Sequence, residues 1–305
     1  MKLSQHTFHL AGIVPVAGQP LDFNFPWHDC LQPIAPDYLA VEHAVVECAM
    51  AGCRTIWVVC NDDMQPLIRY RLGDYVYDYA PLKKASFRKV PSLYYREVPI
   101  FYVPIHPNDR DKRDCLTWSL IHGAWVADSI TRSMSRWVTP QKFFVSWPHG
   151  INHALDIYKF RKRLTTGNKV IFTYGGKTAA DGEFLPFTFT LEDVKRWKNT
   201  IRKKGTGKYE MDYSEDAKPA PYNFKLRPIN ERYSARFFNL EDIIEFEDIT
   251  EEDMAELPWH YNISSWEGYC EYISSEERKR MKRAPPSMLK YHEFNPVGVD
   301  PEENS

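Results

Sequence analysis

The sequence predicts an α/β protein whose central sheet is mostly parallel and is flanked by helices. Three consecutive segments carry this prediction: an apolar run of strand length at 8–16, an amphipathic stretch at 37–52 and a continuously apolar run at 55–60. Asp37 is suited to cap the helix, and Gly52 stands where a helix-terminating glycine is expected. A strand, a helix and a second strand in this order form a βαβ unit, in which the two strands run parallel.

Four more elements follow in the first half of the chain. Their apolar spacing predicts a short helix at 65–72, a strand at 99–105, a long helix at 116–134 and a strand at 142–147. A Pro-His-Gly sequence at 148–150 ends the last of these strands. Ligands of parallel sheets bind at the carboxyl ends of the strands, so the residues just after each strand are the first candidates for a site.

The second half of the chain is less regular. We expect strands at 170–174 and 184–189, a helix at 191–203 capped by Thr190, and a closing helix that begins at a capping box of Ser264 and Glu267. The main domain is expected to span 1–275, with irregular excursions or insertions at 74–97 and 205–258. Residues 276–305 then form a basic helix end and a flexible tail.

Composition limits the kinds of protein that this chain can be. Its 305 residues are 43% hydrophobic with a net charge of −2, so it can bury a full core and has no overall field that attracts nucleic acid or a membrane. No apolar run approaches the roughly 20 residues needed to cross a bilayer. Six scattered cysteines without a C-x-x-C pair predict reduced thiols in the cytoplasm. The basic runs at 195–208 and 278–283 are interpreted as solvated helix faces, with nucleic acid as a minor alternative partner.

Three local patterns stand out in the chain: Gly-Ile-Val-Pro-Val-Ala-Gly at 12–18, the segment 26–34 and the segment 261–269. Together they resemble the sugar-nucleotide nucleotidylyltransferases and the related GT-A glycosyltransferases. The run at 12–18 looks like the first strand of that family entering its phosphate loop. Residues 26–34 occupy the place of its Pro-Lys-Pro-Leu-Leu-Pro-Ile segment, and the helix and strand that follow fall at the family's spacing. Residues 261–269 resemble its late Asp-Ile-x-Thr-Pro-Glu-Asp-Tyr element. The chain is also similar in overall look to proteins of large tailed phages.

The resemblance implies a nucleotide-diphosphosugar transferase-like fold with an elaborated C-terminal part, a nucleotide or nucleotide sugar as ligand, and Mg²⁺ as cofactor. The implied activity is transfer of a nucleotidyl group from a nucleoside triphosphate to a sugar phosphate or a similar small phosphorylated acceptor. Such chemistry needs donors and cations around the phosphates. The residues placed in these roles are His28 and Arg113 for catalysis, Ala17, Gly18, Gln19, Asp62 and His149 for the nucleotide, and Asp109 and Asn262 for the metal.

The chain also departs from the family's pattern. Its glycine-rich loop is reduced to Gly18 followed by Gln-Pro, and a proline removes one backbone donor. The family's lysine is absent from 26–34, and no aspartate follows the strand at 142–147. Asn262 stands where an aspartate is usual; it can ligate magnesium through its carbonyl oxygen, or it can bond the backbone at the capping box. A glycosyltransferase that uses a nucleotide sugar, and a nucleotide-binding or assembly protein without catalysis, are the alternative hypotheses.

Several candidate residues have a structural explanation that the sequence leaves open. His149 and His153 have the spacing of two zinc ligands on a helix, or they flank a turn that leads into a helix. Asp62 is placed to meet a ligand at a strand end, or it belongs to the cap of the next helix. The charged segment 109–114 is a site or a solvated loop, and 174–178 is a phosphate-loop-like segment or, better, a hairpin turn.

Overall fold

A computed structural model of the chain describes residues 8–18, 21, 22, 24–78, 96–110, 115–134, 139–205, 207, 209–214, 219, 223–228 and 238–283. Its centre is an eight-stranded sheet. In sheet order, the strands are β13 (Met254–Glu256), β9 (Ile171–Thr173), β10 (Phe187–Phe189), β7 (Lys142–Val145), β1 (Leu10–Pro15), β4 (Thr55–Cys60), β6 (Arg96–Pro104) and β5 (Tyr75–Asp78).

The sheet is mostly parallel, as the βαβ pattern predicts. Strand β1 pairs in parallel with β4 on one side and with β7 on the other, and β4 pairs in parallel with β6. Strands β10 and β5 run against their neighbours. Every residue of β1 is buried, which accounts for its continuously apolar sequence. The predicted α/β fold class with a mostly parallel central sheet is therefore confirmed.

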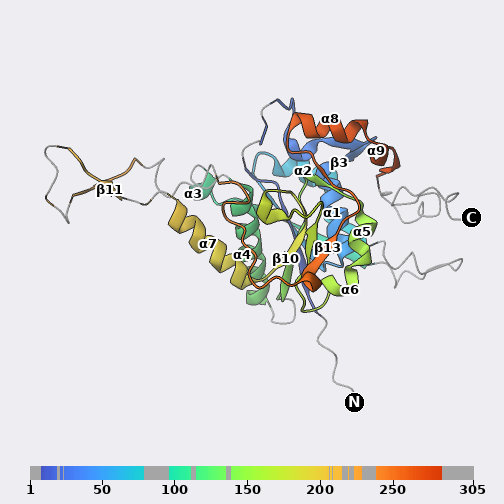
Figure 1. Ribbon diagram of the computed structural model, residues 1–305, viewed down its shortest axis with the longest axis horizontal. Coiled ribbons are helices and arrows are strands. Elements are labelled where there is room, and N and C mark those ends of the chain that lie inside the picture. The colour runs from blue at the N-terminus through green and yellow to red at the C-terminus, as the bar shows by residue number, and fades with distance from the viewer. Residues whose placement is uncertain are drawn as a thin grey trace, which may run out of the picture.

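Helices cover both faces of this sheet (Figure 1). One face packs against α1 (Ala40–Ala51), α2 (Gln65–Leu72), α5 (Ala154–Lys159) and α6 (Arg161–Leu164), and the other against α4 (Leu116–Met134) and α7 (Leu191–Lys204). A Cβ on Gly123 would lie 2.5 Å from the Val59 side chain, so this glycine lets α4 approach the sheet closely. Every helix in the described part of the chain is too short or too polar to cross a membrane.

The end of the molecule at the top of Figure 1 carries several short elements. These are the strand pairs β2 (Pro33–Ala35) with β3 (Tyr38–Leu39) and β8 (Gly150–Ile151) with β14 (Tyr261–Asn262), followed by α8 (Trp266–Ser274) and α9 (Glu276–Arg280). Helix α8 packs through Tyr269 and Tyr272 onto Phe25 and Ile34, which closes a separate apolar cluster. A further pair, β11 (Tyr209–Met211) with β12 (Phe224–Leu226), forms a sheet of its own.

Two predicted helix starts are wrong by a few residues. Helix α1 is capped at Leu39, whose N–H donates to the Glu42 carboxylate, while Asp37 adopts a φ of 55° and binds Arg71 instead. The side chain of Ser265, not Ser264, caps α8 by accepting from the N–H of Gly268. At the other end of α1, Gly52 has the expected left-handed conformation, with a φ of 97°.

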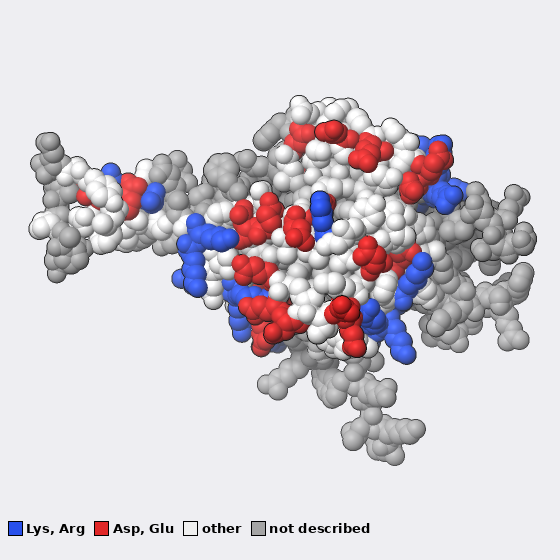
Figure 2. Space-filling model, viewed as in Figure 1, with Lys and Arg blue, Asp and Glu red and all other residues white. Residues whose placement is uncertain are grey.

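Both predicted excursions contribute an edge of the sheet. Strand β5 lies within 74–97 and β13 lies within 205–258, while 79–95 falls outside the described residues. The two basic runs make ion pairs with nearby acidic groups, including Arg196 with Glu247 and Arg283 with Glu42. Figure 2 also shows oppositely charged side chains close together, with Lys and Arg beside Asp and Glu at the lower left of the view.

Candidate functional site

The order of the parallel strands reverses at β1. The chain passes from β1 outwards to β4 and β6, and then returns to place β7 on the opposite side of β1. In open α/β sheets, ligands bind at such a switch point, outside the carboxyl ends of the two strands. The segments that follow β1 and β7, residues 16–18 and 146–149, therefore define the candidate site.

A buried carboxylate joins two histidines at this switch point. Nε2 of His149 lies 2.9 Å from Oδ2 of Asp29, and Nδ1 of His28 lies 2.9 Å from Oδ1. The backbone N–H of Cys30 also donates to Oδ1 at 2.9 Å. Only 3% of Asp29 and 1% of His149 is exposed. Asp29 lies in the connection between β1 and β2, and it thus ties this connection to the turn after β7.

The surroundings keep Asp29 ionised. Burial alone would raise its pKa, but the hydrogen bonds and electrostatic interactions with His149 and His28 outweigh burial and hold the pKa of Asp29 well below its usual range. Nδ1 of His149 is also buried and finds no hydrogen-bond partner among the described residues. An ionised carboxylate and an unused imidazole nitrogen at a switch point are features of a reactive or ligand-binding site.

A second buried network lies behind the first. The Ser146 hydroxyl donates to Oε2 of Glu47 at 2.5 Å, and Oε1 of Glu47 lies 3.2 Å from Nε2 of His43. The same Nε2 is 2.9 Å from the carbonyl oxygen of Asn152, and Nδ1 of His43 is 3.2 Å from the Tyr38 hydroxyl. This network fixes the start of the turn after β7 onto α1. Sequence analysis missed it, although His43 and Glu47 are an ionisable i, i+4 pair within an apolar helix.

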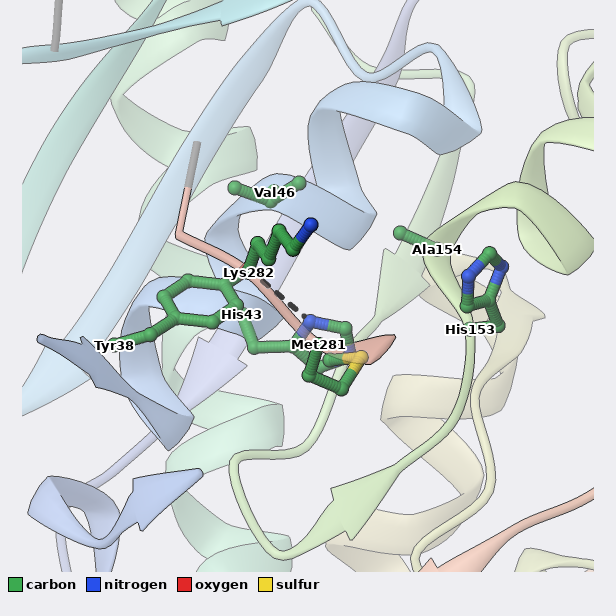
Figure 3. Close-up of a pocket in the computed structure, with 7 residues that line it drawn as sticks. All are labelled: Tyr38, His43, Val46, His153, Ala154, Met281 and Lys282. Carbon is green, nitrogen blue, oxygen red and sulfur yellow. Dashed lines mark hydrogen bonds between the residues drawn. The ribbon is translucent and has the colours of Figure 1, made fainter. Parts of the chain in front are cut away.

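The outer end of this network lies at a small surface hollow (Figure 3). Figure 3 shows the hydrogen bond between Tyr38 and His43 at this hollow, with Lys282 and His153 nearby. The complete lining is Tyr38, His43, Val46, His153, Ala154, Met281 and Lys282. Of the residues singled out from the sequence, the lining includes His153, the candidate zinc ligand.

The segment after β1 is held tightly by the sheet. The N–H groups of Val16 and Ala17 both donate to the carbonyl oxygen of Val59, at 2.8 Å each, and the Ala17 carbonyl accepts from the Ser119 hydroxyl at 2.6 Å. The Ala17 N–H is thus already used by the fold. Gly18 has a φ of 147°, a conformation that favours glycine, and Gln19 lies outside the described residues.

Two of the remaining candidates follow the carboxyl ends of strands of the central sheet. Asp62 follows β4, where Asp63 accepts from the N–H of Met64, and Asp109 lies in α3 (Pro107–Arg110) after β6. Arg113 lies outside the described residues. Asn262 donates to Glu183 at 3.1 Å and accepts from the N–H of Ser264 at 3.1 Å. Within the described part of the chain, no three His, Cys, Asp or Glu side chains form a group that could hold a metal ion.

The structure brings His28, His149 and Asn262 to one end of the sheet. Asn262 pairs with Gly150 in register, and the N–H of Ile263 donates to the carbonyl oxygen of His149 at 2.8 Å. Asp22, in the connection between β1 and β2, accepts from the N–H of Trp266 at 2.9 Å. The segment after β1, the turn after β7 and the start of α8 are therefore neighbours.

Two alternative explanations from the sequence are resolved by the structure. His149 lies in a turn and His153 precedes α5, so the two histidines flank a turn that leads into a helix. Residues 174–178 form a tight hairpin turn, in which Tyr174 pairs with Lys177 and both central glycines have a positive φ.

The buried His260 predicts acid sensitivity. Burial lowers the pKa of His260 from 6.5 to about 4, and the charge of Glu183 opposes this only in part. Between these pH values the unfolded chain binds more protons than the folded one, so stability falls as the pH drops from 6.5 to 4, by about 3 kcal/mol. We expect His260→Phe to remove this contribution in urea unfolding measured across that range, leaving a similar one from His9. An unchanged pH slope would contradict this, and His106→Gln, at an exposed histidine, is the control.

The comparisons with known proteins concern the fold. No protein-family model matches the sequence, and no curated protein sequence matches it. Solved structures do match: a UDP-glucose pyrophosphorylase in complex with UDP-glucose is 13% identical, with a TM-score of 0.50 over 90% of this chain and 100% of that one. A putative glucose-1-phosphate thymidylyltransferase from Bacillus anthracis, in complex with a sucrose, is 9% identical, with a TM-score of 0.51 over 90% and 98%. The chain therefore shares its α/β fold with these two structures.

Proposed function

We propose that the chain binds a nucleotide or nucleotide sugar at the switch point between β1 and β7, and transfers a nucleotidyl group from a nucleoside triphosphate to a sugar phosphate or similar acceptor. The observation that carries this proposal is the buried His28–Asp29–His149 arrangement at that switch point. Two solved proteins with this fold are described as a UDP-glucose pyrophosphorylase and a putative thymidylyltransferase, which supports the choice of substrate class.

In this proposal the chain's own groups bind and orient the phosphates. The carboxylate of Asp29 holds the ring of His28, which is partly exposed and can donate towards a phosphate oxygen. His149 is buried, so it is proposed to act on the nucleotide site by holding the Asp29 carboxylate in place through Nε2. Gly18 allows close approach of the backbone, while Gln19, Asp62 and Arg113 are proposed to complete the nucleotide and phosphate contacts.

The residues around Asn262 could supply Mg²⁺ with few protein ligands. Mg²⁺ is usually bound by one or two carboxylates, with water and substrate phosphates supplying the rest. The carbonyl oxygen of Asn262 has one lone pair left after accepting from Ser264, and Asp109 is proposed as a second contributor. When bound, Mg²⁺ would neutralise charge on the phosphates of the nucleotide.

One observation favours a second function, nucleotide binding without catalysis. The N–H groups of Val16 and Ala17 donate to the Val59 carbonyl, so they are not aimed at a phosphate. A site with fewer backbone donors stabilises the transition state of phosphoryl chemistry less well. Such a protein would bind a nucleotide or nucleotide sugar and release no product.

Binding and turnover distinguish these functions. We expect nucleoside triphosphate with Mg²⁺ to raise the melting temperature and, with sugar phosphates present, to release pyrophosphate. A shift without turnover supports the second function, and a shift with a nucleotide sugar alone supports a glycosyltransferase. No shift with any triphosphate or nucleotide sugar would contradict the proposal.

Replacement of Asn262 by Ala is expected to weaken magnesium-dependent nucleotide binding about tenfold, because it removes a proposed metal ligand. Isothermal titration with and without Mg²⁺ measures this effect. Asn168→Ala is the matched control, since Asn168 precedes β9 and its carbonyl oxygen accepts from Lys142 at the start of β7, the end of that strand away from the candidate site. Equal affinities for the two variants would remove Asn262 from the site.

A further inference from the structure

Helix α1 buries two polar side chains that its packing against the sheet does not require. His43 and Glu47 lie one helical turn apart, and only 2% and 1% of their respective surfaces are exposed. Removal of a carboxyl group from water is costly unless its oxygens find partners. The neighbouring positions of α1 carry small or aliphatic side chains that join the apolar core without this cost. The pair therefore calls for an explanation other than packing.

The partners of this pair lie at the two ends of one segment. Oε2 of Glu47 accepts from the hydroxyl of Ser146, the first residue after β7, at 2.5 Å. Nε2 of His43 lies 2.9 Å from the carbonyl oxygen of Asn152, the first residue after β8, and it must donate because a carbonyl only accepts. One helix thus holds both ends of residues 146–152.

Further contacts keep the pair in this geometry. Oε1 of Glu47 lies 3.2 Å from Nε2 of His43, and the other ring nitrogen lies 3.2 Å from the Tyr38 hydroxyl. Figure 3 shows this contact between Tyr38 and His43. The imidazole therefore cannot turn away from Asn152 without losing contacts at both nitrogens. Ser146 is fully buried, so water does not replace the Glu47 carboxylate as its acceptor.

The middle of segment 146–152 belongs to the candidate site. His149 binds the Asp29 carboxylate through Nε2, and Gly150 pairs with Asn262. Only two residues separate His149 from Ser146 on one side and from Asn152 on the other. A movement at either end of the segment is therefore passed on to His149 and its carboxylate partner.

We propose that Glu47 and His43 are positioning residues for the nucleotide site, which hold segment 146–152 in the conformation that binds the ligand. This inference rests on the function proposed above. The pair acts through Ser146 and Asn152 and does not itself meet the ligand. Residues that orient ligand-binding groups from behind contribute about 10- to 100-fold to affinity at metal sites, and the same geometric reasoning applies to a phosphate ligand.

A double variant separates this role from a contribution to stability. Ser146→Ala alone leaves the buried Glu47 carboxylate without its hydrogen bond, so stability and affinity should both fall. Ser146→Ala/Glu47→Met removes both partners, and apolar replacement of a buried polar pair is often neutral for stability. We expect the double variant to keep the wild-type unfolding transition and to bind a nucleotide about tenfold more weakly. Isothermal titration with UTP or dTTP and Mg²⁺, whichever the wild type binds, measures this affinity.

Thr131→Val is the matched control. The Thr131 hydroxyl is also buried, and it donates to the carbonyl oxygen of Ala127 at 2.6 Å. It lies about 18 Å along α4 from Ser119, which contacts Ala17 at the switch point. Its loss should leave nucleotide affinity unchanged.

Hydrogen–deuterium exchange of the unliganded protein gives a readout that needs no nucleotide. Residues 146–152 should exchange faster in Ser146→Ala/Glu47→Met than in Thr131→Val or the wild type. Unchanged exchange, or wild-type affinity in the double variant, would overturn this inference and leave the proposed function in place. Absence of nucleotide binding by the wild type would overturn the proposed function, and faster exchange in the double variant would then assign the pair a structural role alone.

Discussion

Replacement of Gly150 by Ala is expected to lower the free energy of unfolding by more than about 3 kcal/mol. A Cβ at this position would lie 1.9 Å from the carbonyl oxygen of Phe184 and 2.9 Å from a ring carbon of His260. The first of these atoms belongs to the backbone, so the main chain at Gly150 or at Phe184 must move. Because Gly150 pairs with Asn262, the same movement would disturb the candidate site, and nucleotide binding should be lost as well.

Gly167→Ala is the matched control for this experiment. No heavy atom lies within 4 Å of a Cβ built at Gly167, and its φ is not in the left-handed region. Its free energy of unfolding, measured in urea, should therefore stay within about 0.5 kcal/mol of that of the wild type. Similar midpoints for Gly150→Ala and Gly167→Ala would show that the turn after β7 is looser than described.

Replacement of Asp29 by Ala is expected to cost about 3 kcal/mol of stability and to abolish nucleotide binding. The substitution leaves His149 buried without its carboxylate partner, and breaking a buried pair in this way typically costs 3–5 kcal/mol. The pKa of Asp29 is held low in the folded state, so its contribution is present at neutral pH and is lost as the pH falls through that pKa.

His28→Gln provides the control for Asp29→Ala. His28 contacts the same carboxylate, but 15% of its side chain is exposed, so water can replace part of the contact. We expect a loss of stability below about 1 kcal/mol together with weaker nucleotide binding. Urea unfolding and isothermal titration measure the two effects separately. If Asp29→Ala were no less stable than His28→Gln, the buried pair would not be structural.

The helices were predictable because they depend on local sequence. The expected ranges 65–72 and 116–134 coincide with α2 and α4, since apolar spacing and terminal glycines act within one or two turns. The start of α7 and its cap, Thr190, are as predicted, but the cap of α1 is not. Asp37 has the chemistry of a cap, but it binds Arg71 and Arg283, which come from distant parts of the sequence.

The edge strands lie in the segments without a clear period. Strands β5 and β13 have only four and three residues, and their pairing with β6 and β9 determines them. Such short strands have little periodicity of their own, so tertiary context decides their conformation.

The centre of the candidate site was not predictable for a similar reason. His149 and Asp29 are 120 positions apart, and Ser146 and Glu47 are 99 apart. Sequence analysis placed His149 at a strand end, but no local pattern names its partner. Charged residues such as Glu47 on a buried helix face do give a usable signal, because a buried charge requires a partner.

Hydrogen–deuterium exchange of the full chain with UTP, Mg²⁺ and a sugar phosphate tests the central claim most directly. If the nucleotide binds at the switch point, protection should appear in residues 24–32, 146–152 and 261–269. Protection absent from all three segments with every nucleotide tested, or confined to the hollow around Tyr38 and Lys282, would contradict the proposed site.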